Sequence, residues 1–378
     1  MIGGGWRPTP AQEDLLAAAC GDEAQTRAAW QSWRARLGTR DLAAIDNGSA
    51  KILPLLMPRL ALLPPDDPML PLIRGCYRRA VYHNRMLRAR AAPLLAQLAT
   101  AGIPTMVSKG GVLASVYYRD PGLRPMNDFD VLVPRDRAVE AIRLVLAAGW
   151  VSTQPMPEAL PNAYHSACFR SPDLLDFDLH WHLLPEACFA GAEDAAWKAA
   201  EPLSIDGAMT TALCATDLLV VVCAHAAQWS PVSPVRWVAD ALVIMRESAA
   251  RIDWSRVATL AQRWHVVPHL RDTLHYLEHR WHADVPRHWL TSLERYPVGR
   301  VDRRAYALLG RMPGSLTYLT RPWVRYRLRT RNRWWVNALP GFIDYLKITL
   351  GHTTAGALPR EIVRRYRRWR IDRSRRQR

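Results

Sequence analysis

Residues 108–133, SKGGVLASVYYRDPGLRPMNDFDVLV, combine several local signals that together decide the fold class. The apolar run IPTMV before them and the glycine pair at 110–111 predict a short strand that ends in a tight turn. VLASVYY predicts one or two helical turns, and RDPGLRPMN is a loop rich in turn residues. DFDVLV alternates polar and apolar side chains, which predicts a second strand. This stretch therefore begins a small unit that mixes strands and helices.

The sequence on either side completes this unit. RDRAVEAIRLVLAAGW predicts an amphipathic helix, and AYHSACFRS and LLDFDLHWHLL predict two further strands. Apolar residues at helical spacing predict helices before and after, among them a long helix closed by Gly102. We therefore expect an α+β fold in which helical regions flank a small mixed sheet. The expected regions are a helical region at 1–102, an α/β core at 103–190, a helical region at 191–300 and a basic, aromatic-rich extension at 301–378.

Composition excludes several classes of protein. The chain has 378 residues, 49% of them hydrophobic and 22% charged, which excludes a disordered or fibrous chain. The six cysteines form no CxxC pair, so neither a small disulfide scaffold nor zinc-site spacing is indicated. No run of about 18 apolar residues predicts a membrane span, and the N-terminus lacks a signal-peptide layout. We expect a cytoplasmic protein, with peripheral contact to the inner membrane surface as an alternative.

The net charge of +17 lies at one end of the chain. Residues 300–378 carry 21 Arg or Lys and four Asp or Glu, which accounts for the whole excess. Such a segment attracts nucleic acid, anionic lipid or acidic protein, and the plainer interpretation is a solvated tail in an arginine-rich chain. The chain has 47 arginines and only four lysines: Lys51, Lys109, Lys198 and Lys347.

Aromatic residues are interleaved with the tail arginines, at Trp323, Tyr326, Trp334, Trp335, Tyr366 and Trp369. Three interpretations stay open. The stripe of Ile362, Tyr366 and Trp369 inserts into an anionic membrane, or the tail holds a nucleic-acid acceptor near the site, or the aromatic residues pack on the helical body. The third is favoured, because aromatic stripes usually belong to a core.

Asp128 and Asp130 are the most informative pair of residues. On a strand they point to the same side, with Phe129 on the other. Two adjacent carboxylates repel one another unless a cation neutralises them or one stays protonated, and Mg²⁺ prefers such oxygen ligands. The pair therefore predicts a metal bound together with a nucleotide, against the alternative of a solvated strand end. We expect Asp130→Asn to abolish metal-dependent nucleotide binding and to relieve the repulsion between the acids.

Three further features point to the same chemistry. Ser108-Lys109-Gly110-Gly111 lies between a strand and a helix, where glycines let backbone N–H groups approach phosphates, although an ordinary glycine turn has the same pattern. Arg124 precedes the acid pair and is placed either to clamp a phosphate or to neutralise the acids. Asp178 and His180 alternate onto one face of a later strand, which would bring a third carboxylate to the metal.

These motifs, from Ser108 to Val133 and again in DFDLHWHLL, resemble the uncharacterised nucleotidyltransferase family of bacteria, within the DNA polymerase beta-like nucleotidyltransferase superfamily. Lys109-Gly110, the stretch from Arg124 to Asp130 and the stretch from Asp178 to Trp181 stand in the family's order. The resemblance extends over about 10–285, including HAAQW and VRWVADALVI. The usual Gly-Ser turn of the superfamily is Lys109-Gly110-Gly111 here.

The resemblance implies a small mixed-sheet nucleotidyltransferase core and a magnesium-dependent transfer of a nucleoside monophosphate from a nucleoside triphosphate to an acceptor hydroxyl. Two Mg²⁺ ions, or Mn²⁺ in their place, would be held by the three aspartates. His180 would contact the acceptor or the nucleotide, or would be a core histidine; His225 and Asp240 would be structural partners between helices. The implied catalytic and metal residues are Asp128, Asp130 and Asp178, and the implied nucleotide-binding residues are Ser108, Lys109, Gly110, Gly111, Arg124 and His180.

Two other functions remain open beside this one. A degenerate scaffold would act as a binding or antitoxin-like protein, although such scaffolds have usually lost an acid and this chain keeps three. A related enzyme would transfer a phosphoryl or sugar-phosphate group in a biosynthetic pathway. The acceptor would be a small molecule, a peptide or a sugar, with weak nucleic-acid or anionic-membrane contact through the basic tail.

Overall fold

The computed structural model describes residues 5–38, 45–154, 160–228, 230, 233–310, 314–330 and 338–377. Within these residues seven strands form one mixed sheet, in the order β3-β4-β5-β2-β1-β7-β6. The strands are β1 (Met106–Val107), β2 (Asp128–Leu132), β3 (Val151–Ser152), β4 (Ser166–Arg170), β5 (Asp176–His180), β6 (Glu201–Ile205) and β7 (Ala208–Ala212). β2 runs parallel to β5 and β1 parallel to β7, whereas the other pairs are antiparallel. The expected α+β class is confirmed.

The sheet extends beyond residue 190, where the sequence analysis expected only helices. β6 and β7 form a hairpin whose two-residue turn is Asp206-Gly207, with φ of +48° and +90°. Positive φ at both positions is typical of a type I′ turn, and Asp-Gly is a preferred sequence for it. The two strands are short and little alternation marks them, so the turn was the stronger signal in this segment.

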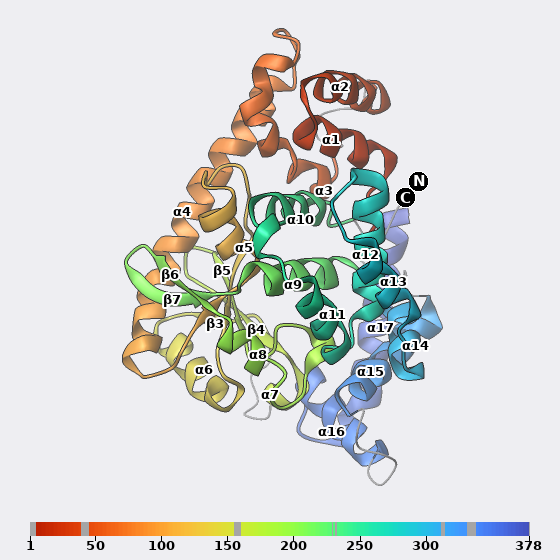
Figure 1. The fold of residues 1–378 in the computed structure, drawn as a ribbon. Helices are drawn as coiled ribbons and strands as arrows, with labels where there is room; N and C mark the ends of the chain where they lie inside the picture. Colours follow the sequence, from red (N-terminus) through yellow and green to blue (C-terminus); the bar gives the residue numbers. More distant parts are fainter. Residues whose placement is uncertain are drawn as a thin grey trace.

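The N-terminal region is helical, and its long helix α4 packs against the sheet. Its helical segments are α1 (Pro10–Cys20), α2 (Glu23–Leu37), α3 (Asn47–Ala50), the 3₁₀ segment η2 (Leu53–Leu62) and α4 (Leu70–Thr100). The expected apolar face of α4, at Leu87, Leu94, Leu95 and Leu98, is buried. Figure 1 shows α4 running the length of the molecule beside the sheet. Gly102 follows it with φ of +66°, a conformation that glycine adopts without strain.

The helices that follow β1 lie around the rest of the sheet and build the C-terminal half of the body. The connecting ones are α5 (Lys109–Val112), the π-helical segment η3 (Leu113–Tyr117), η4 (Arg135–Arg137), α6 (Ala138–Ala147), α7 (Leu160–Ala163), η5 (Pro185–Ala187) and α8 (Asp194–Lys198). The later ones are α9 (Ala215–Ala226), α10 (Arg236–Glu247), η6 (Ala249–Arg251), α11 (Trp254–Arg263), α12 (Val267–Trp281) and α13 (Arg287–Arg295). α9 is buried at almost every position, so it is the central helix of this half.

The basic extension is helical and packs on itself through aromatic rings. It contains α14 (Arg300–Leu309), α15 (Ser315–Arg329), α16 (Ala338–Leu350), η7 (Ala355–Ala357) and α17 (Leu358–Gln377). Tyr318 of α15 stacks on Trp369 of α17 at 4.7 Å between ring centroids and lies 6.0 Å from Tyr366. The stripe proposed for membrane insertion therefore faces a neighbouring helix. Trp334 and Trp335 lie outside the described residues.

A second aromatic group joins the extension to the body. Tyr326, Phe342 and Tyr345 lie within 5.5–6.3 Å of one another and contact Ala163 and Tyr164 of the body. The Tyr164 hydroxyl donates to the Thr349 carbonyl at 3.2 Å. These contacts favour the packing interpretation for the described aromatic residues of the extension.

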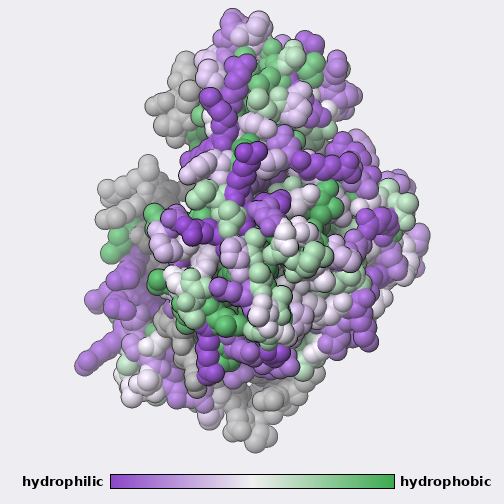
Figure 2. All heavy atoms as spheres, turned by 90° about the vertical axis from the view of Figure 1, so that its left-hand side faces the viewer, coloured by the Kyte–Doolittle hydropathy of each residue, from purple (hydrophilic) through white to green (hydrophobic). Residues whose placement is uncertain are grey.

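One face of the molecule is mostly hydrophilic. Figure 2 shows this face, on which hydrophilic side chains dominate and hydrophobic ones lie in small, separate patches. Scattered apolar residues of this kind are normal on folded proteins. In the described part of the chain, no helix has both the length and the apolarity needed to cross a membrane.

Phe177 tests the placement of β5. Its side chain is fully buried and lies 5.5 Å from Trp150. Phe177→Ala is expected to lower the free energy of unfolding by about 3–5 kcal/mol, because it removes buried contacts and leaves a cavity. Tyr82→Ala, at a side chain that is 68% exposed, is the control and should cost less than about 0.5 kcal/mol in the same denaturant titration. Equal losses for both variants would contradict the placement.

Candidate functional site

Two neighbouring strands bring the expected acids together. β2 and β5 are parallel and in a register that pairs Asp128 with Asp176 and Asp130 with Asp178. Side chains alternate between the faces of a strand, so these acids project from one face of the sheet. The phenylalanine between the two acids of each strand is fully buried on the opposite face. This register is fixed, because a shift by one residue would expose the phenylalanines and bury the acids.

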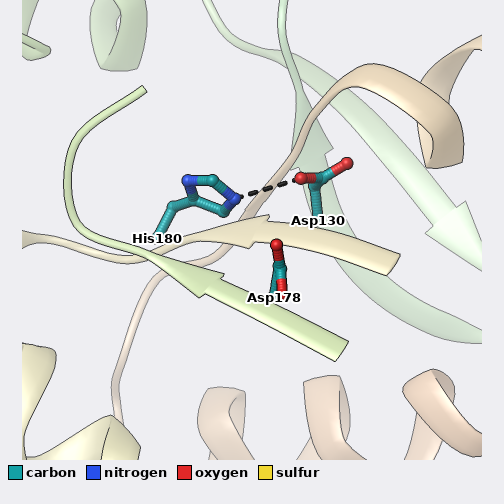
Figure 3. Close-up of side chains that lie close together, drawn as sticks. All are labelled: Asp130, Asp178 and His180. Atoms are coloured by element: carbon teal, nitrogen blue, oxygen red, sulfur yellow. Dashed lines mark hydrogen bonds and ion pairs between the residues drawn. The ribbon is translucent and has the colours of Figure 1, made fainter. Parts of the chain in front are cut away.

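Asp130, Asp178 and His180 form a compact cluster on that face (Figure 3). One ligand atom from each lies within 4.8 Å of the others. His180 Nε2 lies 3.0 Å from Asp130 Oδ1, and the two side chains are only 3% and 5% exposed. The structure therefore brings Asp178 to Asp130 as expected, and it adds His180 to the group. Asp128 lies on the same face but outside this group of three within the described residues.

The cluster fits a divalent cation. Asp178 Oδ1 is buried and has no hydrogen-bond partner in the described part of the chain. A buried carboxylate oxygen without a partner is costly, and a cation between it and Asp130 would remove that cost. Carboxylate oxygens and an imidazole nitrogen are suitable ligands for divalent metals. Cys168 pairs with Asp178 across the strands, but burial and the neighbouring Asp178 raise the pKa of its thiol to about 12, so it offers no thiolate.

Lys109 is the counter-ion of Asp130. Its Nζ donates to Asp130 Oδ1 at 2.8 Å, the oxygen that His180 also faces. Burial opposes the charged form of the lysine, yet Asp130 raises the pKa of Lys109 above its ordinary value. Lys109 has φ of +41°, which is uncommon for a residue with a Cβ atom. The chain turns sharply here from β1 into α5, and the side chain reaches back to β2.

The pKa values of Asp128 and Asp130 are shifted in opposite directions although the residues stand two positions apart. Burial, followed by the charges of Asp130 and Asp178, raises the pKa of Asp128 to about 6. Burial acts in the same direction on Asp130, but Lys109 and His180 outweigh it and hold the pKa of Asp130 well below its usual range. The carboxylate repulsion inferred from the sequence therefore destabilises the ionised form of Asp128. The negative charge of Asp130 is already balanced by Lys109.

The glycine turn is closely packed. A Cβ atom on Gly111 would lie 2.5 Å from Val107 Cγ1, and one on Gly110 would lie 2.7 Å from Arg124 Nη1. The buried Ser108 precedes α5, and its backbone N–H donates to the Asp130 carbonyl at 3.2 Å. The glycines are thus required for packing, as the plainer interpretation held, and they also place the start of α5 beside β2.

Arg124 neutralises an acid other than those expected. Its Nε and Nη2 donate to the Asp240 carboxylate at 3.1 and 2.9 Å, and both side chains are about 5% exposed. Tyr118 donates to the same carboxylate at 3.0 Å. Asp240 is thus a structural partner, as inferred, but of Arg124 rather than of His225. Asn84 of α4 fixes the loop from the other side, because its amide nitrogen donates to the Arg124 carbonyl at 2.8 Å.

A cavity of about 280 Å³ lies beside the acids. Its walls come from the glycine turn, the loop before β2, α3, α9 and α10. Of the residues inferred from the sequence it is lined by Lys109, Gly110, Arg124, Asp128 and Asp130. Several other lining residues had no role expected from the sequence, including Asn47, Lys51, Asn127 and Arg236, and His225 was expected only as a structural partner. The scarcity of lysine was a usable signal, because two of the four lysines in the chain line this one cavity.

The charge states of the two acids predict opposite effects of neutral variants. Because the pKa of Asp128 is raised in the folded state, ionising it lowers stability as pH rises from about 4 to about 6. Asp128→Asn should therefore raise the free energy of unfolding of the metal-free protein at pH 7.5 by about 1–2 kcal/mol, after allowance for solvent screening. Most of this gain should be lost at pH 4, because the folded state then holds the Asp128 proton while the unfolded state, near its ordinary pKa, is only partly ionised.

Asp130→Asn is the matched variant, and here the expectation drawn from the sequence is corrected. It removes a carboxylate that stabilises the fold above its ordinary pKa, so it should lower stability at pH 7.5 rather than relieve repulsion. Thermal melting in a chelating buffer at both pH values measures both variants. Stabilisation by Asp130→Asn together with destabilisation by Asp128→Asn would contradict this assignment.

The family comparison covers the same residues. A family described as uncharacterised nucleotidyltransferase matches residues 48–282, which is more than half of the chain. No curated protein shows significant similarity to the sequence. The matched segment contains the glycine turn, the two acidic strands and the helices that close the cavity. The chain therefore belongs to the uncharacterised nucleotidyltransferase family.

Proposed function

We propose that the protein transfers a nucleoside monophosphate from a nucleoside triphosphate to the hydroxyl of an acceptor, with divalent metal as cofactor. The observation that carries the proposal is the meeting of Asp130, Asp178 and His180 on one face of the sheet, next to a cavity lined by Lys109 and Gly110. Membership of the nucleotidyltransferase family supports the same reaction class. The site supports this reaction more directly than the fold does, because one fold hosts many reactions.

Divalent cations would be held by the acids. Asp130, Asp178 and His180 would hold one, and Asp128 together with Asp130 would hold a second. Mg²⁺ matches the carboxylate oxygens, and Mn²⁺ also accepts the imidazole. Such cations neutralise charge on phosphate oxygens and lower the pKa of an attacking hydroxyl.

The reaction forms a bond from the acceptor oxygen to the α-phosphorus. It breaks the bond from the α-phosphorus to the oxygen that bridges to the β-phosphate, and pyrophosphate leaves with that electron pair. The Asp178 carboxylate would take the hydroxyl proton. Lys109 and the backbone N–H groups of Gly110 and Gly111 would hold the phosphates at the start of α5. Arg124 would support the glycine turn from behind Gly110 rather than bind a phosphate directly, because Asp240 already holds its guanidinium.

A catalytically degenerate binding protein is the principal alternative. The retention of three acids, two of them in one buried cluster with a histidine, favours an active site over this alternative. A phosphoryl or sugar-phosphate transferase would use the same cluster with a different donor. The proposed acceptor is a small molecule, a peptide or a sugar.

The basic extension supports a weak additional contact with a polyanion. The exposed face of α17 carries arginines at positions 360, 364, 367, 368 and 370. Nucleic acid and an anionic membrane surface are the two surfaces that such a face attracts. Tyr366 and Trp369 pack against Tyr318 of α15, so their stripe is not the surface proposed for this contact. The exposed arginines of α17 are the proposed surface.

The transferase proposal is tested by incubating the protein with each α-labelled nucleoside triphosphate and Mg²⁺. Label is scored on the protein and on small molecules recovered from an extract. Transfer by the wild type should fall at least about 100-fold in Asp178→Asn, because the variant removes a charge that holds the cation and takes the proton. Lys198→Met, on the exposed part of α8, is the control. Equal transfer by wild type and Asp178→Asn, or binding of no nucleoside triphosphate by the wild type, would favour the degenerate scaffold.

The polyanion contact is tested with Arg367→Gln/Arg368→Gln, at two adjacent exposed arginines of α17. Binding to single-stranded RNA and to vesicles containing anionic lipid should weaken in this variant, and the wild-type affinity should fall steeply between about 50 and 200 mM salt. Arg78→Gln/Arg79→Gln, an adjacent exposed pair on α4, is the matched control. If the wild type binds neither ligand at low salt, the arginines are only solvated.

A further inference from the structure

One wall of the cavity comes from the N-terminal helical region, outside the expected α/β core. α3 is held there by Asp46, which accepts from the Ser49 N–H at 2.9 Å and from the Gln12 side chain at 2.9 Å. A Cβ atom on Gly48 would lie 2.6 Å from the Ser233 carbonyl oxygen, so α3 packs closely against the segment before α10. Lys51 follows α3 directly and lines the cavity. The backbone at Lys51 is therefore held by the contacts of α3 with Asp46 and with the segment before α10. The glycine turn and the acidic strands take no part in these contacts.

Lys51 has a different electrostatic environment from Lys109. In the described ranges, no carboxylate lies within 4.0 Å of its ammonium group. Burial and the nearby Arg236 lower the pKa of Lys51, while Asp128 acts in the opposite direction. The lysine thus lies between a second cation and the acidic end of β2.

Arg236 adds a second positive charge to the same wall. Its Nη1 donates to the Pro125 carbonyl, and its Nε lies 3.9 Å from Asp240 Oδ2. Asp240 is already bound by Arg124 and Tyr118. Burial and Arg124 lower the pKa of Arg236 to about 10, so it remains charged at neutral pH. This wall therefore carries three cations, Lys51, Arg124 and Arg236, against the one carboxylate of Asp240.

The cavity has its charges separated. Asp128 and Asp130 lie on the strand side, and the excess positive charge lies on the side of α3 and α10. A nucleoside triphosphate with divalent cations has the complementary arrangement, because the cations bind carboxylates and the terminal phosphates carry the remaining negative charge. A nucleoside monophosphate lacks those terminal phosphates.

We infer that Lys51 and Arg236 bind the terminal phosphates of the donor nucleotide, so that the N-terminal helical region supplies part of the substrate site. This inference rests on the proposed function and adds to it the residues that distinguish a triphosphate from a monophosphate. The family match begins at residue 48 and so includes Lys51 and Arg236. Lys109, which the proposed function also places at the phosphates, is bound to Asp130.

The test compares the binding of ATP, AMP and inorganic tripolyphosphate, each with Mg²⁺, by calorimetry. Lys51→Met keeps the length of the side chain and removes its charge, and it should weaken ATP and tripolyphosphate binding at least tenfold. AMP binding should stay within about twofold of wild type, because AMP has no terminal phosphates. Lys51→Arg should recover most of the lost affinity. Lys198→Met, an exposed lysine of α8, should bind all three ligands as the wild type does.

The outcomes separate this inference from the proposed function. Wild-type ATP and tripolyphosphate affinity in Lys51→Met, with ATP binding lost in Asp130→Asn, would overturn the inference and leave the proposed function standing. An equal loss of AMP and ATP binding in Lys51→Met would overturn it as well, because the lysine would then contact the α-phosphate or the acceptor. If the wild type binds no nucleoside triphosphate, the proposed function fails and this inference fails with it. Melting temperatures of the variants within about 2 °C of wild type confirm that they are folded.

Discussion

The parallel pairing of β2 with β5 is the constraint on which the site depends, because it places Asp130 beside Asp178 at adjacent positions of the sheet. The buried phenylalanine between the acids of each strand holds that register. Parallel strands need a long connection, and here it contains α6, β3 and β4, with β4 pairing on the far side of β5. The hydrophobic face of the sheet thus positions its polar face, and the acids meet because the phenylalanines must be buried.

Charge is distributed unevenly around this acidic centre. Lys109 donates to Asp130, and His180 faces the same oxygen. These contacts favour the ionised carboxylate of Asp130, which therefore stabilises the fold. No such partner of Asp128 lies in the described part of the chain, and burial together with the repulsion of Asp130 and Asp178 raises its pKa. Buried charges are tolerated when they are paired, and they carry a cost when they are not. That cost marks two groups as those that gain most from a bound cation: Asp128, and the Asp178 oxygen that has no hydrogen-bond partner among the described residues.

The regions expected from the sequence are not independent in the structure. Arg124 and Asp240 join the loop before β2 to α10 through a buried ion pair, and α3 closes the same cavity from the N-terminal side. The core at 103–190 is therefore completed by residues from both flanking regions. The basic extension attaches elsewhere, through aromatic contacts to Tyr164, and leaves its arginines exposed on α17.

Periodicity and local chemistry in the sequence determined the long helix α4 and the strands at 128 and 176. They also determined that Asp128 shares a face with Asp130, and Asp178 with His180. These features were predictable because strand and helix periods depend only on neighbouring residues. The β6–β7 hairpin was missed although Asp206-Gly207 signalled its turn. Only the tertiary structure decided that Arg124 pairs with Asp240, that His180 rather than Asp128 joins the three-residue cluster, and that Lys51 lines the cavity. These contacts join residues 50 to 116 positions apart or come from separate helices, and no local pattern encodes which of several nearby charges a buried arginine or carboxylate will meet.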